Sequence, residues 1–132
     1  MSHPDDSRAP LSPLESEIMK FVWRRGRVTA VEVHREFAGQ MTNPSVRTLL
    51  RRIEAKGFLT HTRDGRAFIY TPKVGADTVA RGALRRLLDR FYAGSVEQLL
   101  AGLVDGRMTD RRALRKLADR VAAAEKAPRR PR

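Results

Sequence analysis

Helix start and stop signals alternate three times between residues 12 and 57. Residues 12–15 (SPLE) and 29–32 (TAVE) are capping boxes, in which a hydroxyl side chain and a glutamate three residues later each accept a hydrogen bond from the other's backbone N–H. Asn43 followed by Pro44 is a third start signal, because asparagine caps helices and proline suits their first position. These signals predict three short helices. Each is followed by a glycine, which suits the residue after a helix: Gly26, Gly39 and Gly57.

The segment that follows has the composition of a β-hairpin. Residues 58–63 (FLTHTR) and 67–71 (AFIYT) are rich in β-branched and aromatic side chains. Asp64-Gly65 between them is a strong hairpin-turn signal. Three short helices and a hairpin predict a mostly α fold with a small β-hairpin (α+β), the winged helix-turn-helix. Residues 44–56 would be its recognition helix, and the turn would be the tip of its wing.

The predicted recognition helix has one apolar face and one basic face. Apolar residues spaced i, i+3, i+4 and i+7 from Val46 onward are expected to face the core. Residues 41–66 hold six basic and two acidic side chains. A helix fits the major groove of B-DNA, where an arginine can bind guanine O6 and N7 with two hydrogen bonds. The candidate DNA-binding residues are Ser45, Arg47, Thr48, Arg51, Arg52, Arg63 and Arg66.

The overall charge favours the same interpretation. The 132 residues include 27 basic and 15 acidic side chains, a net charge of +12, which indicates an anionic partner, more often nucleic acid than a membrane surface. Two alternatives are that arginine is abundant through codon bias, and that these arginines only keep a helix soluble. The agreement of cap, apolar stripe, glycine stop and basic hairpin favours DNA binding. For a single residue such as Arg52 or Lys56, the solubilising role stays open.

Catalysis and metal binding have little support. His3, His34 and His61 lack the spacing of metal ligands, the chain has no cysteine, and no glycine-rich phosphate loop is present. We therefore expect no enzyme activity, no metal and no cofactor, and no small-molecule ligand is evident. No apolar run approaches the roughly 20 residues of a membrane span, and the first ten residues do not resemble a secretory signal. A cytoplasmic location is expected.

The composition divides the chain into four parts. Residues 1–10 and 126–132 are predicted to be disordered tails, the second of them basic. Residues 11–74 would form the winged-helix DNA-binding domain, and residues 77–125 three further helices that form a dimerisation region.

These C-terminal helices need another surface to bury their apolar side chains. Their start signals are Asp77, a capping box at 95–98 (SVEQ) and Thr109, and so short a region has too little core of its own. Packing back on the winged helix is one solution. A second copy is the one we favour, because helical DNA readers commonly match a twofold operator with twofold symmetry. The candidate dimerisation residues are Leu84, Leu87, Leu88, Phe91, Leu99, Leu100, Leu103, Leu114, Leu117 and Val121.

Several motifs, in order, resemble the penicillinase repressor family, the BlaI, MecI and CopY type of transcriptional regulator. They are residues 21–29 (FVWRRGRVT) with Glu32, 46–53 (VRTLLRRI), 65–66 (GR) with 70–72 (YTP), and 91–96 (FYAGSV). The resemblance implies a winged-helix repressor that dimerises through three C-terminal helices. It also suggests target genes for β-lactam resistance or related envelope stress.

The resemblance also implies a mode of control. In well-known members a membrane sensor protease system triggers cleavage of an Asn-Phe bond in the C-terminal region, which loosens the dimer. Aligned on Gly94 and Ser95, the corresponding bond here is Gly102–Leu103, so this chain departs from the family at the cleavage site. The copper-responsive branch uses cysteines near its C-terminus, and this chain has none. Copper sensing by that route is therefore not expected.

The sequence thus predicts a dimeric, sequence-specific repressor. It would bind a palindromic double-stranded DNA operator through the helix 44–56 and the wing 58–71, and be derepressed by proteolysis. The alternative is an architectural winged-helix protein that binds DNA without sequence preference.

Overall fold

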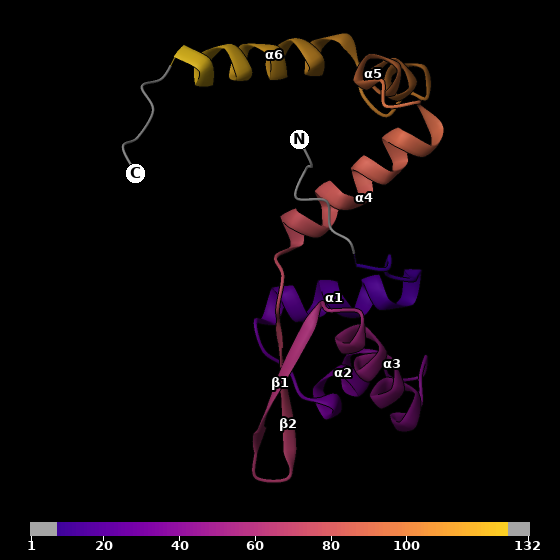
Figure 1. Ribbon diagram of the computed structural model, residues 1–132, viewed down its shortest axis with the longest axis vertical. Helices are drawn as coiled ribbons and strands as arrows, with labels where there is room; N and C mark the ends of the chain where they lie inside the picture. The colour runs from indigo at the N-terminus through magenta and orange to yellow at the C-terminus, as the bar shows by residue number, and fades with distance from the viewer. Residues whose placement is uncertain (1–7, 127–132) are drawn as a thin grey trace. The chain divides into compact units, whose positions relative to one another are not determined.

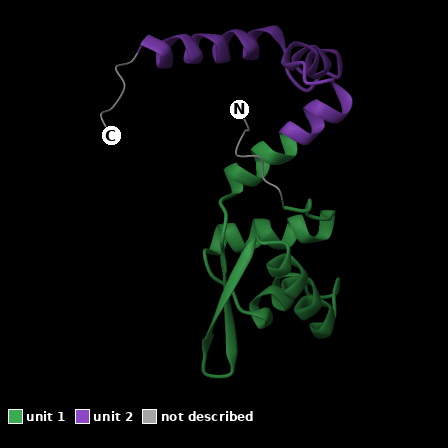
Figure 2. Ribbon diagram, in the orientation of Figure 1, with its two compact units in different colours: residues 1–84 green, residues 85–132 purple. Residues whose placement is uncertain are grey.

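The computed structural model describes residues 8–126, and two compact units are present in it, residues 1–84 and 85–132 (Figure 2). Residues 1–7 and 127–132, which carry most of the two predicted tails, lie outside the described residues.

The first unit has the predicted order of elements (Figure 1). Three helices precede a two-stranded antiparallel sheet, and a fourth helix begins after it. This order confirms the mostly α winged helix with a small hairpin. The elements are α1 (Pro13–Arg25), α2 (Ala30–Glu36), α3 (Asn43–Ala55), β1 (Leu59–Asp64), β2 (Ala67–Pro72) and the start of α4 (Ala76–Phe91).

The helix start signals work as local chemistry predicts, with one shift. Both capping boxes are complete, since Ser12 and Thr29 each accept from the glutamate N–H three residues on and donate their own N–H to its carboxylate. The prediction that Asn43 caps α3 is wrong by one residue. Thr42 has extended backbone angles and its hydroxyl accepts from the Ser45 N–H at 3.3 Å, so Asn43 is already helical.

One apolar core lies under the three helices and the base of the hairpin. The predicted stripe of α3 is confirmed as part of it, and Tyr70 of β2 joins it from the wing. Val28, just before α2, forms a backbone bridge to Tyr70, with N···O distances of 2.9 and 2.7 Å. This bridge ties the wing to the helices. The buried apolar residues are Ile18, Met19, Phe21, Val22, Val28, Ala30, Val33, Val46, Leu49, Leu50, Ile53, Phe58, Leu59 and Tyr70.

The turn of the hairpin also differs by one residue from the prediction. Asp64 pairs with Ala67 across the sheet, so the two-residue turn is Gly65-Arg66 rather than Asp64-Gly65. Gly65 has φ +63°, a conformation that glycine adopts without strain and that two-residue hairpin turns use at their first position. Arg66 therefore lies at the tip of the wing.

The second unit contains the C-terminal part of α4, then α5 (Val96–Asp105) and α6 (Arg111–Lys126). Ser95 caps α5 by accepting from the Gln98 N–H at 3.1 Å. Two predicted caps are wrong, the first by two residues and the second by one. Asp77 lies inside the first turn of α4, and the α6 cap is Asp110, whose carboxylate accepts from the Ala113 N–H at 2.9 Å, rather than Thr109.

Candidate nucleic-acid interface

The outer face of α3 presents the predicted DNA-binding side chains to solvent. Ser45, Arg47, Thr48, Arg51 and Arg52 are all exposed, while the apolar stripe of the same helix is buried. None of these arginines forms an ion pair with an acid among residues 8–126. Their charge is therefore available to a polyanion.

The C-terminal end of α3 is held by the segment that precedes α1. Lys56 Nζ lies 2.6 Å from Glu15 Oε1 and donates to the Pro10 carbonyl oxygen at 3.0 Å. Arg8 Nε donates to the Gly57 carbonyl oxygen at 2.8 Å. Lys56 thus has a structural partner, unlike the exposed arginines. Residues 8–10, which the sequence analysis placed in a tail, contact the end of the recognition helix.

The Glu15 carboxylate is fully buried in this contact. Burial raises the pKa of this carboxyl, but the hydrogen bond and the charge of Lys56, together with the backbone and hydroxyl of Ser12, outweigh it. The resulting pKa lies below the ordinary value of 4.5. The carboxylate is therefore held in its charged form inside the fold.

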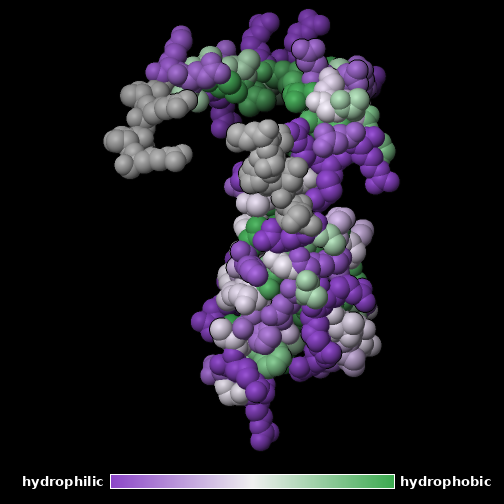
Figure 3. Space-filling view, viewed as in Figure 1, coloured by the Kyte–Doolittle hydropathy of each residue, from purple (hydrophilic) through white to green (hydrophobic). Residues whose placement is uncertain are grey.

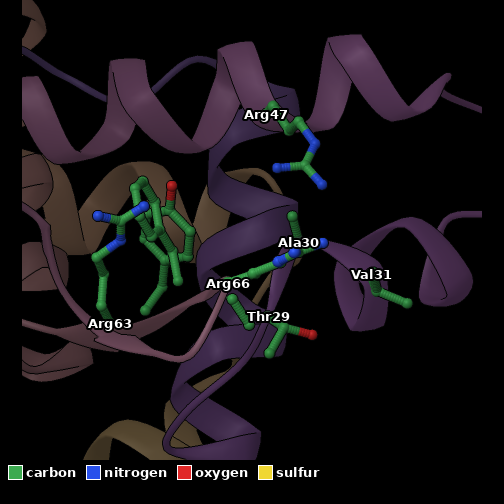
Figure 4. Close-up of a pocket in the computed structure, with 9 residues that line it drawn as sticks. Thr29, Ala30, Val31, Arg47, Arg63 and Arg66 are labelled. Atoms are coloured by element: carbon green, nitrogen blue, oxygen red, sulfur yellow. The ribbon is translucent and has the colours of Figure 1, made fainter.

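The wing adds two further arginines. Arg63 and Arg66 are exposed on β1 and at the turn. Figure 4 shows Arg66 reaching from the wing toward Ala30, with Arg47 of α3 beyond it and Arg63 on the other side. These three arginines line a shallow hollow of about 160 Å³ together with the start of α2 and two aromatic residues of β2. The arrangement concentrates positive charge between the recognition helix and the wing.

The sequence did not predict a cluster that joins Glu54 of α3 to His61, Phe68 and Arg63 of the wing. His61 Nδ1 of β1 lies 2.8 and 2.7 Å from the two carboxylate oxygens of Glu54 on α3. The His61 ring stacks on Phe68, with centroids 4.4 Å apart, and the Arg63 guanidinium lies 5.4 Å from the Phe68 centroid. The one available signal was that Glu54 is the single acid in a basic helix.

Tyr70 lies beside the same cluster, at the base of the hollow. Burial and the nearby Glu54 carboxylate raise the pKa of the Tyr70 hydroxyl, and the charges of Arg51 and Arg47 act in the opposite direction. Side chains from α3 and the wing therefore share one electrostatic environment.

The candidate dimerisation residues are mostly left open to solvent by the single chain. Leu88 is buried, whereas Phe91 is 66% exposed and Leu117 48% exposed. Figure 3 shows hydrophobic residues gathered over α5 and α6. Leu84, Leu87 and Val121 are exposed too, and the half-exposed members of the set are Leu99, Leu100, Leu103 and Leu114.

Gly102, at the predicted cleavage bond, lies within α5. A Cβ placed on Gly102 would come 2.8 Å from the Tyr92 hydroxyl, so the two residues are in close contact. Within residues 8–126 no helix is long and apolar enough to cross a membrane, and no group of acidic or histidine side chains could hold a metal ion.

A buried three-helix core, a two-stranded wing and an exposed basic recognition helix define a winged-helix DNA-binding protein. The model of the penicillinase repressor family matches residues 11–123. The chain therefore belongs to the penicillinase repressor family and is a DNA-binding transcriptional repressor. The resemblance seen in the sequence motifs is confirmed, and this family is one of regulators rather than a class of enzymes.

Two sequence relatives agree with this assignment. The penicillinase repressor of Bacillus licheniformis is 30% identical over 97 residues, which cover 72% of this chain and 76% of the relative. The methicillin resistance regulatory protein MecI of Staphylococcus aureus is 23% identical over 103 residues, or 76% of this chain and 84% of MecI. The solution structure of the DNA-binding domain of the repressor BlaI aligns with a TM-score of 0.48 and 31% identity, covering 52% of this chain and 85% of that domain.

Proposed function

We propose that the protein is a dimeric, sequence-specific repressor that binds a palindromic operator. In this proposal α3 reads the bases in the major groove and the wing contacts the DNA backbone. The observation that carries this proposal is the unpaired basic face of α3, which lies beside a wing with Arg66 at its tip. Arg47 and Thr48 lie in the first turns of α3, where recognition helices reach base edges. The remaining arginines are assigned to phosphates.

Dimerisation is supported by the apolar side chains that the second unit leaves exposed. A monomer gains nothing from exposing Phe91, Met108, Leu117 and Val121, and a second copy would remove such surface from water. Two copies would also present two recognition helices to the two halves of a palindrome.

Proteolytic derepression at Gly102–Leu103, by a membrane sensor protease system, completes the proposal. Gly102 is helical and half-buried against Tyr92, and proteases bind extended chains. Cleavage here therefore requires local unfolding of α5 first. Weakening of the dimer would follow, because α5 belongs to the exposed apolar surface.

The deciding experiment is a genome-wide DNA pull-down with the purified protein at about 150 mM salt, which suppresses loose electrostatic binding. A few sharp peaks that share an inverted repeat are expected. A broad distribution without a motif would contradict specific repression and favour the architectural alternative.

A further inference from the structure

Glu54 is an unexpected residue on a DNA-binding surface. It lies on α3 between the exposed arginines and the end of the helix, where its charge opposes the approach of phosphate. Its carboxylate does not project freely into solvent. Both of its oxygens lie within 2.8 Å of His61 Nδ1, and the side chains are only 28% and 34% exposed.

The contact to His61 continues along the wing. His61 and Arg63 lie two residues apart on β1, and their cross-strand partners are Tyr70 and Phe68. Residues two apart on a strand share a face, so these four side chains lie on the same face of the hairpin. His61 stacks on Phe68 at an interplanar angle of 20°, and Arg63 lies over the Phe68 ring. A line of direct contacts thus runs from α3 to a wing arginine.

We propose that Glu54 and His61 are positioning residues that set the angle of the wing against the recognition helix. The hairpin is a two-stranded sheet that projects from the core, and such a sheet bends easily when it is held only at its base. The Glu54–His61 bond holds it at mid-length from the α3 side. Arg63 and Arg66 then meet the backbone of the same duplex that α3 reads. This inference rests on the proposed DNA-binding function.

Electrostatics and positioning make different predictions for neutral substitutions of Glu54. If its charge were all that mattered, every neutral substitution would strengthen DNA binding equally. If it positions the wing, the effect depends on whether the new side chain can accept a hydrogen bond from His61. Glu54→Ala cannot accept one, whereas the amide oxygen of Glu54→Gln accepts from a neutral imidazole. The two variants have the same net charge, so their comparison isolates the bond.

The experiment measures the affinity of both variants for a random duplex of about 20 base pairs, roughly two helical turns. It is run at low salt and at one pH for both variants. Glu54→Ala is expected to bind about two- to tenfold more weakly than Glu54→Gln, the range of one hydrogen bond. The matched control is Glu17→Ala against Glu17→Gln, an exposed acid on α1 bonded to Lys20, where no difference is expected.

A second substitution tests positioning rather than general stability. Arg66→Ala is expected to weaken DNA binding severalfold when it is added to Glu54→Gln. When it is added to Glu54→Ala, the expected loss is less than about twofold, because Arg66 on a displaced wing would already have lost its DNA contact. Equal affinities of the two Glu54 variants would overturn the proposal. So would an Arg66→Ala effect that is the same, or absent, in both backgrounds.

A measurement without DNA separates this inference from the proposed function. Residual dipolar couplings of backbone amides report the orientation of the hairpin relative to α3. The orientation is expected to change in Glu54→Ala and to be retained in Glu54→Gln. Unchanged couplings in Glu54→Ala would refute the positioning role even if DNA binds. If the wild type bound no DNA, the proposed function would fail while the couplings still decided this point.

Discussion

At the scale of single residues, the most consequential contact is the one between Glu15 and Lys56. The carboxylate is completely buried, and its Oε2 atom has no hydrogen-bond partner among the described residues. Oε1 therefore makes the hydrogen bonds that offset the cost of burying the charge, because it accepts from the Lys56 ammonium and the Ser12 N–H. The contact joins the start of α1 to the end of the recognition helix.

Lys56→Met keeps most of the side-chain volume and removes the cation. It is expected to lower the free energy of unfolding by about 2–4 kcal/mol, near the lower part of the range for breaking a buried pair, because Lys56 is 22% exposed. Urea denaturation measures the change. Lys20→Met, which breaks an exposed pair with Glu17, is the control and should cost less than about 1 kcal/mol. Equal losses of unfolding free energy in the two variants would show that the Lys56–Glu15 pair contributes no more than an exposed ion pair.

Glu15 also makes stability depend on acid. Its pKa is lowered in the folded state, so its contribution is present above the ordinary value of 4.5 and is lost as the pH falls through the lower folded value. Glu15→Gln is expected to flatten the loss of stability as the pH falls below about 4.5. Denaturation curves at several pH values measure the slope, with Glu17→Gln as the control. A slope identical to that of the wild type would assign the acid sensitivity to other carboxyls.

At the scale of elements, the proposed function gives α3 and the wing different tasks on DNA. The recognition helix would supply the side chains that reach base edges, whereas the wing tip offers one arginine at a two-residue turn. Base contacts and phosphate contacts can be separated by comparing sequences and salt concentrations.

Arg47→Ala tests base readout by α3. It is expected to cost about 1–3 kcal/mol on the operator recovered from the pull-down and much less on random DNA, since only the correct base pairs offer the arginine its two hydrogen bonds. Titrations on both duplexes measure the costs. A cost that is equal on both would remove Arg47 from the specificity-determining set.

Arg66→Ala tests the wing. It is expected to weaken binding to operator and random DNA alike, and to reduce the slope of log affinity against log salt by about 0.9, the value for one phosphate contact. Salt titrations on the two duplexes measure this slope. If the loss were confined to the operator, the wing would read bases.

At the scale of the whole molecule, the open question is how the exposed apolar side chains of the second unit are covered. Leu88 is already buried in the single chain, so replacing it would disturb the unit itself. Leu117 is 48% exposed, and its substitution leaves the chain's own packing largely unchanged.

If the protein forms the proposed dimer, Leu117→Asp is expected to convert it to a monomer, because the carboxylate would be buried without a partner in the interface. Sedimentation measures the mass, and circular dichroism checks that helix content is retained. Arg115→Asp is the control, because helical geometry places it opposite Leu117 on α6. A dimer that survives Leu117→Asp would exclude this face of α6 from the interface.

Features that depend on neighbouring residues were predictable from the sequence. The two capping boxes, the stripe from Val46 to Ile53 and the hairpin follow from interactions within a few residues, and the structure confirms them. The caps of α3 and α6 and the turn were each one residue off, because two adjacent polar or turn-forming residues compete for the same position and final backbone angles decide between them. The cap of α4 was two residues off, since Asp77 lies inside the helix that follows Gly75.

Contacts between residues of different elements were not predictable. Glu15 and Lys56 are 41 residues apart, and the Glu54–His61 bond forms only because the wing folds back against α3. A sequence shows that a glutamate and a histidine exist, but hydrogen bonding depends on distances of a few ångströms that packing of the shared core establishes. The local pattern thus sufficed for the fold, the family and the basic face, whereas the anchoring of the recognition helix and the wing emerged from tertiary packing.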